Sequence, residues 1–141
     1  MLAGHIDTLL RNPSTDTNDA MTRLEGLVAF FKLVEDKEAF RATYARHLSH
    51  RLLAASGHLW LDGERFVVDQ FKAICGVGYS SAMSKMVADI SAVGDTMTAF
   101  DPQHSGYDIY VLTGGSWPLT VNSYPFKWPK EVSLFGLLIY I

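Results

Sequence analysis

The stretch that decides the fold is Lys37–Ala54, KEAFRATYARHLSHRLLA. Its apolar residues recur at steps of four, the spacing of one face of an α-helix: Phe40, Tyr44, Leu48 and Leu52. Glu35-Asp36 offers a break and an N-terminal cap just before it. We therefore predict a helix from about Lys37 to Ala54, with His47 and Arg51 at the edge of its apolar stripe.

Three further helices are predicted, one before this helix and two after it. The first starts behind a cap at Asn18-Asp19 and has helical apolar spacing: Leu24, Leu27, Val28, Phe31 and Val34. Asp62 can cap the next helix, which Gly76 ends: Phe66, Val67, Phe71 and Ile74. Ser80 can cap the last, which Gly94 ends: Met83, Met86, Val87 and Ile90. Four helices joined by short turns indicate a four-helix bundle.

The composition changes between Gly94 and Gly106. All six arginines lie at or before Arg65, whereas four of the five prolines lie at or after Pro102. We therefore divide the chain into a helical bundle, residues 1–94, and a partial α/β segment with an irregular apolar tail, residues 95–141. The predicted fold class is mainly α, of the α+β kind.

One β-strand is predicted in the second part, at Tyr107–Thr113. Its residues are rich in β-forming types and are bounded by Gly106 and by Gly114-Gly115. A lone strand cannot satisfy its own backbone groups, so this strand has to pair with a later segment or with another protein.

Length, composition and charge exclude several classes of protein. With 48% hydrophobic residues, 141 residues suffice for one packed domain, and a net charge of -3 does not favour binding to nucleic acid or to an anionic membrane. The longest apolar run, Leu134–Ile141, falls far short of the ~20 residues that span a bilayer. The chain has a single cysteine, Cys75, and residues 1–10 are too polar for a signal peptide. We expect the protein in the cytoplasm and/or the nucleus.

The sequence contains no arrangement of reactive side chains that predicts an enzyme. His47 and His50 have a metal-binding spacing but project to different sides of their helix, and Cys75 ends an apolar helix face, where an inert thiol is usual. Gly76-Val77-Gly78 follows a helix, so a helix end followed by a helix start explains it better than a phosphate loop. Acidic residues such as Glu64 fit first-turn helix charges. We predict no metal and no cofactor; the alternative is a small helical metalloprotein built on His47, His50 and Cys75.

Three collinear motifs resemble those of the cullin family. Tyr44–Leu53 has the form Y-x-x-H-L-x-x-R-L-L. Phe71–Gly76 with Tyr79–Ser81 is similar to K-L-K-x-x-C-G-x-x-F/Y-T-S, and Tyr107–Pro118 resembles a segment ending in V-L-x-x-G-x-W-P. The likeness extends over Ile6–Pro129. Within it, structural roles are implied for the motif residues Tyr44, His47, Leu48, Arg51, Leu52, Phe71, Lys72, Cys75 and Gly76.

The resemblance implies a fold and a function. Residues Ile6–Val93 would be the four-helix bundle of the cullin homology region, and Tyr107–Leu112 the first strand of the α/β subdomain behind it. Cullins are non-catalytic scaffolds of ubiquitin ligases in ubiquitin-dependent protein degradation, and a RING-box protein adds a strand to their α/β subdomain. The implied partners are a RING-box protein or another ligase subunit. The implied strand edge comprises Tyr107, Ile109, Tyr110, Val111, Leu112, Trp117 and Pro118.

The resemblance covers only a part of a full-length cullin. The N-terminal adaptor-binding repeats and the C-terminal winged-helix domains are absent, so we expect a cullin truncated at both ends. The alternative is a stand-alone fragment that sequesters ligase subunits or has no activity.

Overall fold

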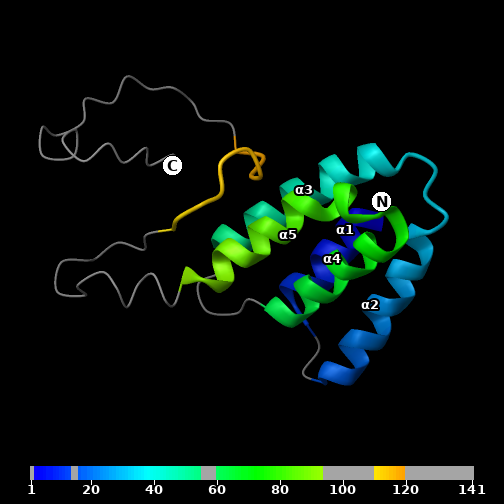
Figure 1. Ribbon diagram of the computed structural model, residues 1–141. Coiled ribbons are helices and arrows are strands. Elements are labelled where there is room, and N and C mark those ends of the chain that lie inside the picture. Colours follow the sequence, from blue (N-terminus) through cyan, green and yellow to red (C-terminus); the bar gives the residue numbers. More distant parts are fainter. Residues whose placement is uncertain (1, 14–15, 55–59, 94–109, 120–141) are drawn as a thin grey trace, which may run out of the picture.

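The computed structural model describes residues 2–13, 16–54, 60–93 and 110–119 (Figure 1). Within these ranges lie five α-helices and no β-strand: α1 Leu2–Arg11, α2 Thr17–Phe31, α3 Lys37–Ala54, α4 Leu61–Cys75 and α5 Val77–Ser91. The prediction of a mainly helical fold is confirmed. The division at residue 94 stays a prediction, because residues 94–109 are outside the described ranges.

The helix α1 was not among the four predicted from the sequence. It buries Ala3, Ile6 and Leu10, which are three and four residues apart and so lie on one face. The polar residues between them make this stretch unsuitable as a signal peptide, but they suit the outer face of an amphipathic helix. α1 packs against both α2 and α3, so the bundle has five helices where four were expected.

The other helices pack around a core rich in aromatic rings. α4 packs against α5 and α2, and α3 packs against α5 (Figure 1). The Phe71 ring lies between these helices and meets the edges or faces of four others, with centroid distances from 4.5 to 6.3 Å: Phe31, Phe40, Tyr44 and Tyr79. Aromatic pairs in such tilted and edge-on arrangements stabilise a core beyond their buried area.

Three predicted helix starts differ from those in the structure. α2 is capped by Asp16, whose side chain accepts a hydrogen bond from the Asn18 N–H, so the cap is two residues before Asn18-Asp19. α4 begins at Leu61, and Asp62 lies in its first turn without capping it. α5 begins at Val77, which places Ser80 inside the helix, where it is buried. In each case the residue predicted as the cap lies inside the helix, because the residues just before it are also helical.

Two glycines are required by the geometry around α4. Gly76 is the only residue between α4 and α5 and has a φ of +89°, a left-handed value that favours glycine. It ends α4, as predicted, and also precedes the first residue of α5, whose start was predicted at Ser80. A Cβ atom on Gly63 would lie 2.5 Å from Cε3 of the Trp60 ring, so only glycine lets that indole lie across the first turn of α4.

None of the helices in the described parts of the chain is both long and apolar enough to cross a bilayer.

Candidate functional site

The bundle contains a buried ion network centred on Arg51. Arg51 Nε donates to Glu64 Oε1 at 2.6 Å and Nη2 donates to Glu64 Oε2 at 2.9 Å, so the two groups form a two-point ion pair. Nη1 donates to Asp7 Oδ1 at 2.5 Å. The Tyr44 hydroxyl accepts from Nη2 at 3.4 Å and donates to Glu64 Oε2 at 3.3 Å. A single guanidinium on α3 therefore connects α1, α3 and α4.

The burial of this network corrects two predictions. Arg51 is only 3% exposed and Glu64 only 1%, so Arg51 is not at the edge of the apolar stripe and Glu64 is not an ordinary first-turn charge. Ionised groups taken out of water require a paired, fully hydrogen-bonded arrangement. Every buried side-chain nitrogen and oxygen among the described residues has a hydrogen-bond partner. The network therefore joins α1, α3 and α4 through buried, paired charges.

The network also sets the protonation states of its members. Burial alone would raise the pKa of Asp7, but hydrogen bonds from Arg11 and Arg51 and their charges hold that pKa below its usual value. Burial would lower the pKa of Arg51, yet its hydrogen bonds to Glu64 and the neighbouring negative charges raise it. Burial and the charge of Glu64 raise the pKa of the Tyr44 phenol well above its usual value. The pKa values of these three groups are thus shifted away from neutral pH. Asp7 and Arg51 therefore stay charged and the Tyr44 phenol stays protonated, which suits a structural role.

The remaining motif residues occupy structural positions. Gly76 joins α4 to α5, Cys75 is half-buried beside it, and Lys72 is exposed on α4. His47 Nδ1 lies 3.6 Å from Asp7 Oδ2 at the margin of the network. The apolar motif residues are all in the core: Leu48, Leu52 and Phe71.

The side chains of the metalloprotein alternative do not come together. Within the described ranges, no group of three or more His, Cys, Asp or Glu side chains is placed to hold a metal ion. His47 faces a carboxylate, while His50 is exposed on α3.

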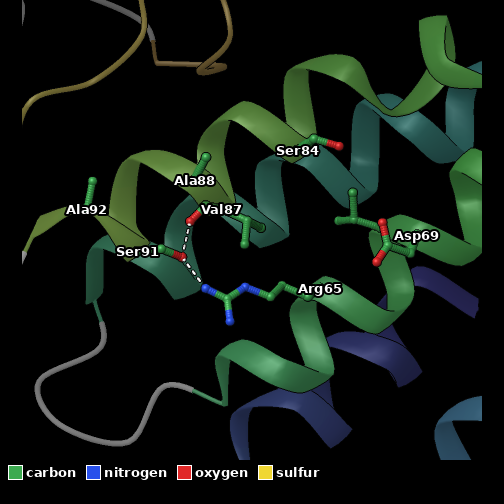
Figure 2. A pocket seen from close by; sticks show the side chains of 8 residues that line it. Arg65, Asp69, Ser84, Val87, Ala88, Ser91 and Ala92 are labelled. Atoms are coloured by element: carbon green, nitrogen blue, oxygen red, sulfur yellow. Dashed lines mark hydrogen bonds between the residues drawn. The ribbon is translucent and has the colours of Figure 1, made fainter.

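An open groove of about 540 Å³ runs between α4 and α5 (Figure 2). Arg65 Nη2 spans it and donates to Ser91 Oγ at 2.9 Å, and Ser91 Oγ donates to the Val87 carbonyl at 2.8 Å. Its charged lining residues are Arg65 and Asp69, and the rest of the lining is small or apolar: Val68, Ser84, Val87, Ala88, Ser91 and Ala92. The Ser91 hydroxyl is thus hydrogen-bonded to a guanidinium and to a backbone carbonyl, neither of which is a base that could activate it.

The predicted partner-binding edge falls partly within the described segment, residues 110–119. Tyr107 and Ile109 lie outside the described residues. Val111 and Pro118 are exposed, and three residues are half-buried: Tyr110, Leu112 and Trp117. The described residues of this stretch are not in a β-strand, so the strand itself stays a prediction. The segment, gold in Figure 1, lies beside α5.

One carboxylate on α5 attaches this segment to the bundle. Asp89 Oδ2 accepts the Thr113 backbone N–H at 2.7 Å and the Trp117 indole N–H at 2.8 Å. Asp89 Oδ1 accepts the Thr113 hydroxyl at 2.7 Å. The Trp117 ring also packs against the hydrophobic core. We call these contacts the Asp89 clamp.

Three residues of these sites were missed by sequence reasoning: Asp7, Glu64 and Asp89. Asp7 and Arg11 form an ion pair one helical turn apart, a local pattern that could have indicated α1. Glu64 carried no local sign of burial, because acidic residues are common in the first turn of exposed helices. Asp89 bonds to residues 24 and 28 positions further along the chain, so no local spacing could have indicated it.

Comparison with known proteins bears directly on the sequence motifs. Residues 1–97, more than half of the chain, match the family model described as the cullin alpha solenoid domain. The chain is 31% identical over 140 residues to Cullin-1 of Schizosaccharomyces pombe, covering 94% of this chain and 18% of that protein. It is 30% identical over 154 residues to Cullin-1 of Caenorhabditis elegans, covering 96% of this chain and 19% of that protein.

A plant relative shows the same relationship. Cullin-3A of Arabidopsis thaliana is 31% identical over 122 residues, which cover 82% of this chain and 16% of the relative. The chain thus spans less than a fifth of the length of these curated relatives. The match includes the helices that hold the Arg51 network and the helix that carries Asp89. The chain therefore belongs to the cullin family.

Proposed function

We propose that this chain contributes to a cullin-type scaffold of a ubiquitin ligase and binds a RING-box protein. Membership of the cullin family supports the scaffold role. The observation that carries the proposal is the segment 110–119, which continues the cullin-like sequence and is attached to the helical bundle by the Asp89 clamp. In this role the chain positions other proteins and performs no reaction of its own.

The exposure of Val111 supports the proposed mode of binding. Val111 is 66% exposed and lies in the sequence between the half-buried Tyr110 and Leu112. A partner strand laid along such a segment gains main-chain hydrogen bonds, and the side chains around it provide specificity. The chemistry of ubiquitin transfer would belong to an enzyme that the RING-box protein recruits.

We also propose that the protein works in the cytoplasm or the nucleus. Its single cysteine is free and half-buried in the structure, which fits a reducing compartment.

The test compares two exposed valines that differ only in location. Val111 is 66% exposed in the segment, and Val77 is 64% exposed at the first position of α5. Proline at residue 111 removes a backbone donor from the proposed strand edge, whereas proline is tolerated at the first position of a helix. We expect Val111→Pro to weaken binding of a purified RING-box protein at least about ten-fold and Val77→Pro to leave it unchanged, as measured by calorimetry.

A full-length cullin serves as the positive control in this experiment. If it binds the RING-box protein while the unmodified chain does not, the binding proposal is wrong. Adding the chain to a reconstituted ubiquitylation reaction then separates the two remaining cases. Inhibition would indicate a chain that sequesters other ligase subunits, and no effect would indicate a chain without activity in this system.

A further inference from the structure

We propose that Asp89 is a positioning residue for the partner strand: its carboxylate fixes the turn after the binding edge and so sets where that edge lies on the bundle. The inference rests on the proposed RING-box binding and goes further by assigning the position of the edge to one side chain on α5. Asp89 itself need not touch the partner.

Three hydrogen-bond donors converge on the Asp89 carboxylate. Both oxygens of Asp89 are used, at distances from 2.7 to 2.8 Å, by a backbone N–H, a hydroxyl and an indole N–H. Hydrogen bonds to an ionised acceptor are shorter and stronger than those between neutral groups. One of the donors is the main chain of Thr113, so the clamp fixes the backbone as well as the side chains.

A tight turn joins the two residues that Asp89 holds, Thr113 and Trp117. The Ser116 N–H donates to the Thr113 carbonyl at 3.2 Å, and Gly115 adopts a φ of +74° at the third position of this turn. A positive φ at that position favours glycine. The turn reverses the chain, which brings Thr113 and Trp117 to the same carboxylate.

The Asp89 clamp lies directly after the proposed binding edge in the chain. Thr113 directly follows Tyr110–Leu112, so fixing its N–H fixes the end of that stretch. On the other side of the turn, the Trp117 ring packs against the core and prevents the turn from swinging away. A segment held in place before binding loses less conformational freedom when a partner strand joins it.

The experiment uses the full chain with two substitutions of Asp89 and one matched control. Asp89→Ala removes both acceptors. Asp89→Asn keeps the shape, since its carbonyl can accept both N–H groups while its amide donates to the Thr113 hydroxyl. The control is Asp69→Ala, because Asp69 is an exposed carboxylate on the neighbouring helix α4.

Two quantities are measured for each variant. Hydrogen exchange at the Thr113 amide reports the clamp, and calorimetric titration with a RING-box protein reports binding. We expect Asp89→Ala to raise exchange at Thr113 and to weaken RING-box binding by about ten-fold or more. Asp89→Asn should recover most of both, and Asp69→Ala should change neither. Circular dichroism confirms that each variant retains its helices.

The outcomes separate this inference from the proposed function. If the unmodified chain fails to bind the RING-box protein, the proposed function fails and the inference with it. If the chain binds but Asp89→Ala binds equally well despite faster exchange at Thr113, the proposed function stands and the positioning role is wrong. Should Asp89→Ala lose its helices, Thr113→Val removes the hydroxyl contact from the segment side, and unchanged binding together with faster exchange would again contradict the inference.

Discussion

The Arg51 network and the Asp89 clamp both depend on carboxylates, but they differ in depth and in what they hold. Arg51 and Glu64 are almost completely buried and lie between helices of the bundle. Asp89 is half-buried on α5 and holds a segment against the surface of the bundle. We infer that the network belongs to the global stability of the fold, whereas the clamp controls a local opening.

Breaking the Arg51 network should cause the largest loss in the free energy of unfolding. Glu64→Ala leaves the Arg51 guanidinium buried without its two-point partner, a change that costs about 3 to 5 kcal/mol in the free energy of unfolding. Urea denaturation of the purified chain measures this loss. In the same experiment, removing the exposed Glu38 that pairs with Arg41 should cost no more than about 1 kcal/mol.

A double variant tests whether the loss in Glu64→Ala comes from the unpaired charge. Arg51→Met combined with Glu64→Leu replaces the pair with apolar side chains and should recover most of the stability lost in Glu64→Ala. A loss below about 1 kcal/mol in Glu64→Ala alone would mean that the network contributes little to global stability.

Truncating the aromatic core should cost as much free energy of unfolding as breaking the Arg51 network. This cost measures how much apolar packing contributes to the stability of the bundle. Phe71 is fully buried against four other rings, so Phe71→Ala should cost about 3 to 5 kcal/mol. Phe30 is 61% exposed on α2, so Phe30→Ala should stay within about 0.5 kcal/mol. Thermal or urea unfolding compares the two, and equal losses would contradict the assigned core.

The contact between Asp7 and Arg51 should give a smaller, pH-dependent effect. Since the pKa of Asp7 is lower in the folded than in the unfolded chain, its ionised form contributes stability above the unfolded pKa of about 3.9. This contribution is lost as the pH falls through the folded pKa. We expect Asp7→Asn to cost roughly 1.5 to 3 kcal/mol at pH 7, the range for hydrogen bonds to charged groups.

Unfolding curves recorded between pH 7 and pH 2 test this sign. The difference between Asp7→Asn and the parent chain should shrink as the pH falls below about 4. A difference that stays constant over this range would show that the charge of Asp7 does not stabilise the bundle.

The smallest effect on global stability is expected at the clamp. Trp117→Phe keeps an aromatic ring but removes the indole donor to Asp89, which is worth about 1 kcal/mol of local stability. Hydrogen exchange at Thr113 should then rise about five-fold, while the global free energy of unfolding changes by less than about 0.5 kcal/mol. If the free energies of local opening at Thr113 and of global unfolding change by equal amounts, the segment unfolds together with the bundle. The clamp then does not control a local opening.

The sequence pattern predicted the helices best where apolar spacing was regular. The expected helix Lys37–Ala54 is confirmed residue for residue as α3, and Gly76 separates α4 from α5 as expected. The helix α1 was not predicted from periodicity, although its buried residues Ala3, Ile6 and Leu10 have helical spacing, because a helix of 10 residues offers only this short apolar pattern.

The contacts between distant residues could not be predicted from the sequence. Periodicity assigns a residue to a face of its own helix but does not say which side chain another helix brings to it. For that reason Arg51 was placed at the margin of a stripe and Glu64 on an exposed first turn, although they form a pair 13 positions apart. The Thr113 and Trp117 contacts with Asp89 depend on tertiary structure in the same way.

The separation of Asp7 from Arg51 has a consequence for the order in which the chain folds. The two residues are 44 positions apart, so α1 is synthesised long before its ionic partner on α3 exists. At translation rates of ~5 to 20 residues per second, that delay is roughly 2 to 9 seconds. During this interval Asp7 can pair with Arg11 on its own helix, but α3 is not yet present to cover the apolar face of α1. The ionic contact that joins α1 to α3 therefore forms only after the chain has been extended 44 residues beyond Asp7.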